Sequence, residues 1–375
     1  MMNFDNTPSR EGSYAYKWEK YKGRDILPAW IADTEYPCAP PIAEALTKRI
    51  AGSALGYTLP KHYTPASEAI ANWCAAQYGW QIETSWIVWT PGVVPAFNMA
   101  CKAYCQPGDS VMVQTPNYPP LLAAPALNGL KQVCIGTILD NNRYTLDLDE
   151  LAKQAAKPEC KLFLLCNPMN PVGSVLQKQE LDKIAAICNE HSVVLCSDEI
   201  HCDLILDDVA HIPAGAVDAI SERSITLMAA SKTFNVAGLG TSFAIIPNAK
   251  VRARFVNAMG GIVPWPNVLG LVAVEAAFNE CDDWRKQQLA YLRSNRDYLV
   301  KAVNEISGLS AVSPQATFLL WINAGDLGVD NTQTWIEDKG VGPSPGKDFG
   351  DSSCFRLNFG CSHDYLQQII KRMQA

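Results

Sequence analysis

The sequence predicts an α/β protein, with a large domain built on a mostly parallel seven-stranded sheet covered by helices and a smaller α+β domain. Two observations predict this fold. Short apolar runs recur through the middle of the chain, and several are separated by stretches with the apolar spacing of a helix, such as residues 177–191 with Leu181 and Ile184. From about Asn279 a long amphipathic stretch replaces this alternation. Strands that alternate with helices are typical of parallel βαβ units.

The predicted strands are short apolar segments bounded by polar or turn residues. They are residues 85–90, 109–115, 130–137, 161–168, 192–199, 224–231 and 239–247. The C-terminal part is expected to form a long helix over 281–306, short strands around 317–322 and 354–360, and a last helix.

The first fifty residues have no apolar pattern of their own, so they are expected to pack with the C-terminal part. We therefore predict three segments. Residues 1–48 form an N-terminal arm and part of the small domain, residues 49–278 form the large domain, and residues 279–375 form the rest of the small domain.

Composition limits the classes of protein to which this chain can belong. The chain has 375 residues, of which 48% are hydrophobic and 18% charged, enough for a large core and about two domains. A net charge of -7 and the lack of any basic block argue against a nucleic-acid partner. The N-terminus is polar, and no stretch approaches the roughly 20 apolar residues of a membrane helix. We expect a cytoplasmic protein with no membrane partner.

The 13 cysteines lie mostly inside apolar segments, where a reduced cysteine behaves as a small hydrophobe. Cys196, His201 and Cys202 are the candidates for a metal site, but their spacing matches no C-x-x-C pair, so no metal is predicted. The common nucleotide and hydrolase motifs, such as G-x-G-x-x-G and G-x-S-x-G, are absent.

Reactive groups follow two of the predicted strands. Lys232 comes directly after the strand at 224–231, and in open α/β sheets ligands bind at the carboxyl ends of strands. A plain surface lysine is an equal alternative. Asp198 ends the strand at 192–199, where a carboxylate is costly unless it meets a cation or strong donors. Taken alone, Asp198 is better interpreted as a helix N-cap.

Two loops complete the set. The N–H groups of Gly92, Val93 and Val94 open a predicted helix and can bind an anion such as phosphate, although taken alone this stretch is better interpreted as an ordinary strand–helix turn. The turn "NPMNPVG" can hold the Asn170 amide in a fixed orientation or be only a turn. Pyridoxal phosphate needs a lysine, a carboxylate for its ring nitrogen, a donor for its ring hydroxyl oxygen and a phosphate cradle.

Seven motifs in order carry a resemblance that covers nearly the whole chain: "LGYT", "TPGVV", "PNYPP", "NPMNPVG", "SDEIH", "SKTFNVAGL" and "FRLNFG". The sequence resembles the fold-type I pyridoxal-phosphate enzymes, the aspartate-aminotransferase superfamily. Within it, "PAWIADTEY", "TPGVVPA", "SDEIHCDL" and "SKTFNVAGL" are most similar to the MalY/PatB-type cystathionine β-lyases, which cleave carbon–sulfur bonds.

The resemblance implies a role for each matching residue. Lys232 bonds covalently to pyridoxal phosphate, Asp198 pairs with the ring nitrogen and Tyr118 stacks on the ring, and these three are the implied catalytic residues. The other implied cofactor contacts are Asn170 and His201, the phosphate-binding residues Val93, Val94 and Ser231, and Tyr57 from the neighbouring subunit of a homodimer. Arg356 would bind the substrate α-carboxylate as a two-pronged pair, with Tyr57, Asn170 and Ala32 also at the substrate. Without the family, Arg356 is better interpreted as a surface ion pair.

The function implied is a carbon–sulfur β-lyase that cleaves cystathionine or related cysteine S-conjugates to a thiol, pyruvate and ammonia. The glycine at position 240, where the aminotransferases offer an arginine, favours this branch. The alternatives are an aminotransferase acting on an amino acid and a 2-oxo acid, and a pyridoxal-phosphate-binding regulator without turnover.

Overall fold

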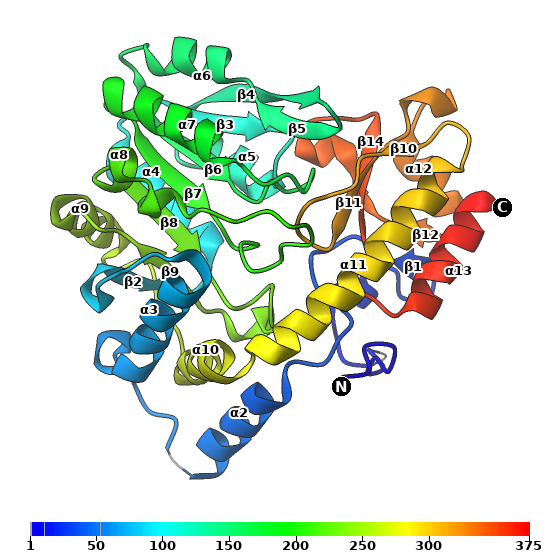
Figure 1. Ribbon diagram of the computed structural model, residues 1–375, viewed down its shortest axis with the longest axis horizontal. Coiled ribbons are helices and arrows are strands. Elements are labelled where there is room, and N and C mark those ends of the chain that lie inside the picture. The colour runs from blue at the N-terminus through cyan, green and yellow to red at the C-terminus, as the bar shows by residue number, and fades with distance from the viewer. Residues whose placement is uncertain (1, 11, 53) are drawn as a thin grey trace.

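The computed structural model describes residues 2–10, 12–52 and 54–375 (Figure 1). Its main sheet has eight strands in the order β2-β9-β8-β7-β6-β3-β4-β5. Their bounds are β2 Ile87–Thr90, β3 Ser110–Thr115, β4 Lys131–Asp140, β5 Arg143–Leu146, β6 Cys160–Cys166, β7 Val194–Asp198, β8 Ser224–Met228 and β9 Ser242–Ile245. The five central strands from β8 to β4 are parallel, whereas β9 runs antiparallel to both of its neighbours.

The strand count predicted from the sequence, seven, was wrong by one. The additional strand is β5, which pairs antiparallel with β4 in a hairpin. Asn141 and Asn142 connect the two strands with φ of 47° and 58°, the backbone of a two-residue type I′ turn. Because the end of β4 is exposed and only Leu146 of β5 is buried, the hairpin lacks the apolar run by which the other strands were found.

Helices cover both faces of this sheet. One face carries α4 (Val93–Tyr104), α5 (Pro119–Leu127) and α9 (Ala249–Met259), and the other carries α6 (Leu148–Ala155), α7 (Lys178–Glu190) and α8 (Asp218–Ser221). Neighbouring side chains of β6 alternate between the two cores, since Leu162 and Leu164 pack with α4 while Phe163 and Leu165 pack with α7. The parallel strands are therefore buried on both faces, as their continuous apolar runs predict.

A further layer of helices packs against β2 and β9, since Trp89 and Phe243 of these strands share one hydrophobic core with its side chains. Helix α10 (Val268–Glu280) packs against α2 (Pro40–Gly52) and α3 (Thr64–Tyr78). The long helix α11 (Asp282–Asn304) then runs from this layer to the C-terminal part, and joins the two halves of the molecule (Figure 1). No helix within the described residues is long and apolar enough to cross a membrane.

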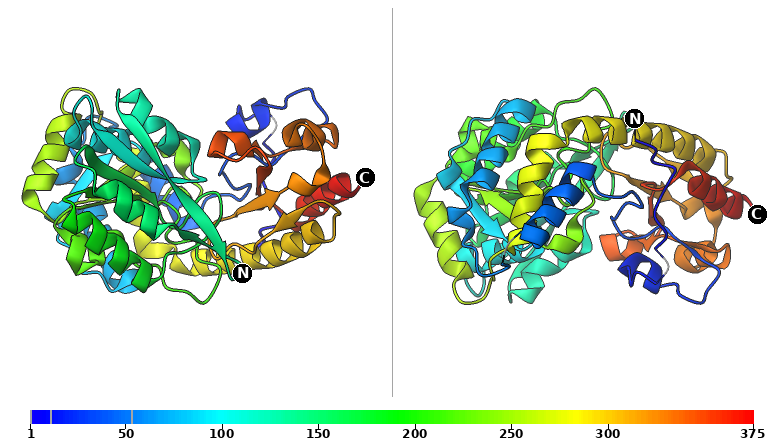
Figure 2. Two further views of the ribbon diagram at one scale, coloured as in Figure 1. Left: turned by 90° about the horizontal axis from the view of Figure 1, so that it is seen from above. Right: turned by 90° about the horizontal axis from the view of Figure 1, so that it is seen from below.

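The C-terminal part holds a four-stranded antiparallel sheet in the order β10-β11-β14-β13. Its strands are β10 Ser310–Ala311, β11 Leu319–Asn323, β13 Ser344–Pro345 and β14 Cys354–Asn358, and its other helices are α12 Thr332–Asp338 and α13 His363–Gln374. Figure 2 shows this part beside the main sheet, with the N-terminal segment (dark blue) against it.

The N-terminal segment contains α1 (Tyr16–Glu19) and β1 (Leu27–Pro28). β1 pairs in parallel with β12 (Val341–Gly342), so the start of the chain packs on the C-terminal part as the sequence analysis expected. The domain boundaries at 48 and 278 stay a prediction.

Candidate active site

Most of the predicted site residues line a single cavity of about 370 Å³, which lies where the main sheet, the N-terminal segment and the C-terminal part meet. Those residues are Ala32, Val93, Tyr118, Asn170, Asp198, His201, Lys232 and Arg356. The volume is within the usual range for a small-molecule site.

The sheet topology explains why residues far apart in sequence meet here. β6, β7 and β8 are adjacent and parallel, so their carboxyl ends lie at one edge of the sheet. Asn170 follows β6, Asp198 is the last residue of β7 and Lys232 follows β8. β2 points the same way, because it and β8 both run antiparallel to β9, and it places the N-terminus of α4 at the same edge.

Asp198 is a buried carboxyl group without an ion-pair partner among the described residues. Its Oδ1 accepts one hydrogen bond, from the backbone N–H of Ile200 at 3.2 Å. Burial raises the pKa of Asp198 to about 7, and the nearby charge of Glu199 adds to the rise. The N-cap interpretation was wrong, because β7 is followed by a turn and the next helical residue is Ala214.

The Lys232 ammonium donates to the backbone carbonyl of Ala32 at 2.6 Å. Desolvation lowers the pKa of this lysine, and Arg356 lowers it further, while Asp33 and Asp198 oppose the change. Lys232 therefore gives up its proton more readily than a surface lysine, and the interpretation as a plain surface residue was wrong.

Arg356 is buried, with no carboxylate within ion-pair distance among the described residues. Its Nη1 donates to Asn170 Oδ1 at 2.9 Å, and its Nη2 donates to the Trp30 carbonyl at 2.6 Å and to Ser344 Oγ at 3.1 Å. The guanidinium also lies over the Phe349 ring, 4.6 Å from its centroid. Desolvation lowers the pKa of Arg356 to about 10. The surface ion-pair interpretation was wrong, and a buried cation without a counter-ion suits a carboxylate ligand.

The remaining predicted residues differ in position. His201 is buried, and its Nδ1 has no hydrogen-bond partner in the part of the chain that the structure describes. Burial lowers the pKa of His201 to about 3, so the ring is neutral near pH 7. Tyr118 caps α5 at the cavity wall, and burial raises the pKa of its hydroxyl. Val93 lines the cavity, but Val94 and Ser231 do not.

Tyr57 is not brought to this cavity by its own chain. Its side chain is wholly exposed, and it lines a different, largely apolar groove together with Trp265 and Val268. Its predicted role in a neighbouring subunit's site stays a prediction.

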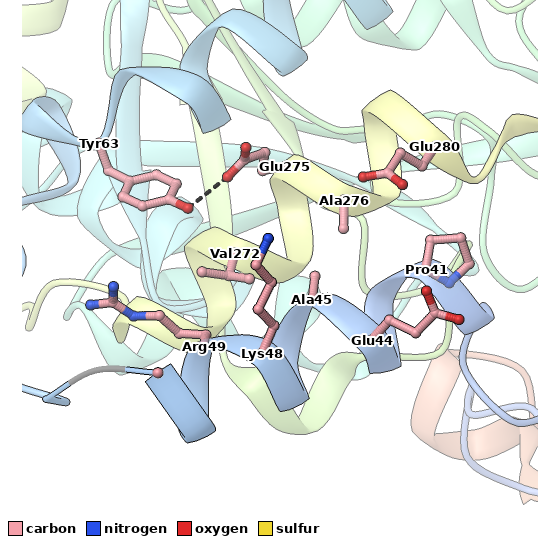
Figure 3. Close-up of a pocket in the computed structure, with 11 residues that line it drawn as sticks. Pro41, Glu44, Ala45, Lys48, Arg49, Tyr63, Val272, Glu275, Ala276 and Glu280 are labelled. Carbon is pink, nitrogen blue, oxygen red and sulfur yellow. Dashed lines mark hydrogen bonds between the residues drawn. The ribbon is translucent and has the colours of Figure 1, made fainter.

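Two other features lie outside this cavity. A polar cavity of about 600 Å³ is lined by residues of both α2 and α10. There the Tyr63 hydroxyl donates to Glu275 Oε2 at 2.6 Å, and Lys48 points from α2 toward α10 (Figure 3). None of the predicted site residues lines it. Within the described ranges no group of three His, Cys, Asp or Glu side chains is placed to bind a metal ion. The candidates Cys196, His201 and Cys202 therefore form no such group.

Sequence reasoning missed the residues that hold Arg356, namely Trp30, Ser344 and Phe349, and three that line the cavity mouth, Tyr16, Lys20 and Asp348. Trp30 lies in "PAWIADTEY", so the resemblance could have identified it. Ser344 and Phe349 lie in "GPSPGKDFG", whose glycines and prolines indicate only turns.

The fold, together with a lysine and a buried carboxylate at adjacent strand ends, is that of the fold-type I pyridoxal-phosphate class. The chain belongs to the aminotransferase class I and II family, whose model matches residues 31–373. It is 34% identical to "Cystathionine beta-lyase PatB" of Bacillus subtilis (strain 168), with 100% of this chain and 99% of the relative covered.

Two solved structures are similar over nearly their whole length. One is the crystal structure of OvoB, with 42% identity and a TM-score of 0.96, covering 99% of this chain and 98% of that one. The other is cystalysin from Treponema denticola, described as containing a pyridoxal 5'-phosphate cofactor, with 30% identity and a TM-score of 0.95, covering 100% of this chain and 98% of that one.

Proposed function

We propose that this protein is a pyridoxal-phosphate-dependent carbon–sulfur β-lyase, which cleaves cystathionine or a related cysteine S-conjugate to a thiol, pyruvate and ammonia. The observation that carries the proposal is the convergence of Lys232, Asp198 and Arg356 on one cavity. The similarity to a cystathionine β-lyase over the whole chain and to a pyridoxal-phosphate-containing structure supports it.

The residues present fit this cofactor. The Asp198 carboxyl is buried and forms no ion pair with the described residues, and a protonated ring nitrogen would supply a cationic partner. His201 lines the same cavity, and its buried Nδ1 has no hydrogen-bond partner among the described residues. No described side chain caps the first turn of α4, which leaves the N–H groups of its first residues for a phosphate.

The proposed roles follow from these positions. Asp198 would pair with the ring nitrogen, and Tyr118 would stack on the ring face. Asn170 and His201 would contact the polar edge of the ring. The phosphate would be held by Val93, Val94 and Ser231. When bound, pyridoxal phosphate withdraws electrons from the substrate's α-carbon. Arg356 would bind the α-carboxylate in a bidentate pair and so fix the orientation of the substrate, beside Asn170 and Ala32.

Lys232 is the base that the geometry offers for the α-proton. Its Nζ reaches the Ala32 carbonyl, and its lowered pKa favours the neutral amine that accepts a proton. Loss of the α-proton to Lys232 allows the Cβ–S bond to break, and the sulfur leaves with the electron pair as a thiolate. The remaining three-carbon fragment takes up water and yields pyruvate and ammonia.

The decisive assay is pyruvate release from cystathionine with and without an added 2-oxo acid. A β-elimination consumes no acceptor, so we expect sustained pyruvate and ammonia without the oxo acid and no more than about a twofold change when it is added. An aminotransferase, by contrast, stops after one turnover without an acceptor. Strict dependence on the oxo acid, with no thiol released, would assign the aminotransferase function instead.

We also propose that the protein works as a homodimer in which Tyr57 completes the partner's site. The groove that contains Tyr57 has a volume of about 940 Å³ and includes the exposed apolar side chains of Leu55, Val256 and Trp265. An exposed apolar surface of this kind is typical of an interface.

The cytoplasm is the proposed location, since all 13 cysteines are free and most are buried.

Mixing two inactive variants tests the shared site. Tyr57→Ala and Lys232→Ala protomers should form hybrid dimers with one intact site each, which restores about a quarter of the wild-type activity after random exchange. Subunit exchange is verified with differently tagged chains, and mixing each variant with itself is the control. Full exchange without recovery of activity would place Tyr57 outside the partner's site.

A further inference from the structure

The mouth of the active-site cavity carries two opposite charges that the chemistry described so far does not use. Lys20 and Asp348 both line the cavity that contains Lys232 and Arg356. They do not pair with each other within ion-pair distance, and neither makes an ion pair with any other described residue. Burial lowers the pKa of Lys20, and the nearby negative charges of Glu337 and Asp348 oppose this change.

Lys20 is held in place by aromatic rings. Its ammonium lies over the rings of Trp30 and Tyr21, 4.6 Å and 4.9 Å from their centroids. Trp30 is itself fixed, since its Nε1 donates to the Lys17 carbonyl at 2.9 Å, and its own carbonyl accepts from Arg356 at 2.6 Å. One residue, Trp30, therefore links the cation at the mouth to the cation at the base of the cavity.

Asp348 lies next to the other aromatic residue that contacts Arg356, Phe349. It belongs to the short helix η6 (Gly346–Phe349) and immediately precedes Phe349. The Phe349 ring packs against the Arg356 guanidinium, 4.6 Å from its centroid. Thus Trp30 connects Lys20 with Arg356, and Phe349 connects Asp348 with Arg356.

Lys20 and Asp348 are exposed residues of the cavity lining. With the α-carboxylate assigned to Arg356 and the α-carbon to Lys232, they are the charged groups of the cavity left for the side chain of a cysteine S-conjugate. We propose that Lys20 and Asp348 bind the carboxylate and the ammonium of a leaving thiol that is itself an α-amino acid, and that they determine the specificity of the enzyme. This inference rests on the proposed β-lyase function and assigns its leaving-group site.

Four conjugates separate the contributions of the two charges in the holoenzyme. Cystathionine has a zwitterionic leaving group, S-carboxyethylcysteine an anionic one, S-aminoethylcysteine a cationic one and S-ethylcysteine a neutral one. For Lys20→Gln we expect kcat/KM for cystathionine and S-carboxyethylcysteine to fall about tenfold relative to S-ethylcysteine. For Asp348→Asn we expect the same relative loss for cystathionine and S-aminoethylcysteine.

The comparison with S-ethylcysteine removes any general loss of folding or turnover. Lys22→Gln and Asp338→Asn are the matched controls, because both positions are exposed and neither lines the cavity. The double variant Lys20→Glu with Asp348→Lys should recover part of the activity on cystathionine relative to the single Lys20→Glu variant. Cleavage of the conjugates with unshifted ratios in both single variants would overturn this inference alone. If the wild-type holoenzyme released no thiol from any conjugate, the β-lyase proposal would fall with it.

Discussion

Replacement of Lys232 by alanine is expected to lower kcat for pyruvate release by at least about a thousandfold. Two lysines among the described residues line the cavity, Lys232 and Lys20. Lys232 lies near Asp198 and Arg356, whereas Lys20 lies at the mouth. Loss of Lys232 would therefore remove both the proposed covalent attachment point of the cofactor and the proposed base for the α-proton.

A second readout separates these roles from misfolding. Borohydride should attach the cofactor covalently to the wild-type chain, in the peptide that contains Lys232, and should leave the variant unlabelled while the variant still binds cofactor. Lys178→Ala is the control, because Lys178 forms only an exposed ion pair with Asp182. Labelling of another lysine together with near-normal turnover would contradict the assignment of Lys232.

The edge of the main sheet could be predicted from the sequence because its chemistry is local. Asn170, Asp198 and Lys232 each follow a short apolar run, and consecutive parallel strands bring their carboxyl ends together whatever the details of packing. The same reasoning failed for β5, whose register depends on a two-residue turn and whose side chains are mostly half exposed.

The environment of Arg356 could not be predicted in this way. Its partners come from segments distant in sequence: Trp30 from the N-terminal segment, Asn170 from the loop after β6, and Ser344 from β13. These contacts exist only once β1 pairs with β12 and the four-stranded sheet docks beside the main one. Periodicity and turn residues contain no information on such docking, so the residues at the mouth became visible only in the structure.

Removal of the Asp198 carboxyl should have the second large effect, a fall in kcat of at least about a hundredfold for Asp198→Ala. The physical reason is the cost of a buried charge. Burial raises the pKa of Asp198 to about 7, although the Ile200 N–H and the Lys232 charge oppose the rise. A cationic ring nitrogen beside Asp198 would stabilise the ionised carboxylate, and the carboxylate would stabilise the cationic ring in turn. An alanine leaves the ring nitrogen without this partner, and a neutral ring is a weaker electron sink.

The test compares three variants at saturating cofactor. Asp198→Glu keeps a carboxylate and should retain more turnover than Asp198→Ala. Asp182→Ala, at a half-exposed helix position outside the cavity, should match the wild type. Bound cofactor is measured by its visible absorbance, so that loss of binding is distinguished from loss of turnover. A purely structural carboxyl would make alanine and glutamate variants differ in stability and leave kcat of the folded fraction close to wild type. Equal, near-normal kcat in both variants would mean that the buried carboxyl of Asp198 only closes the turn at Ile200.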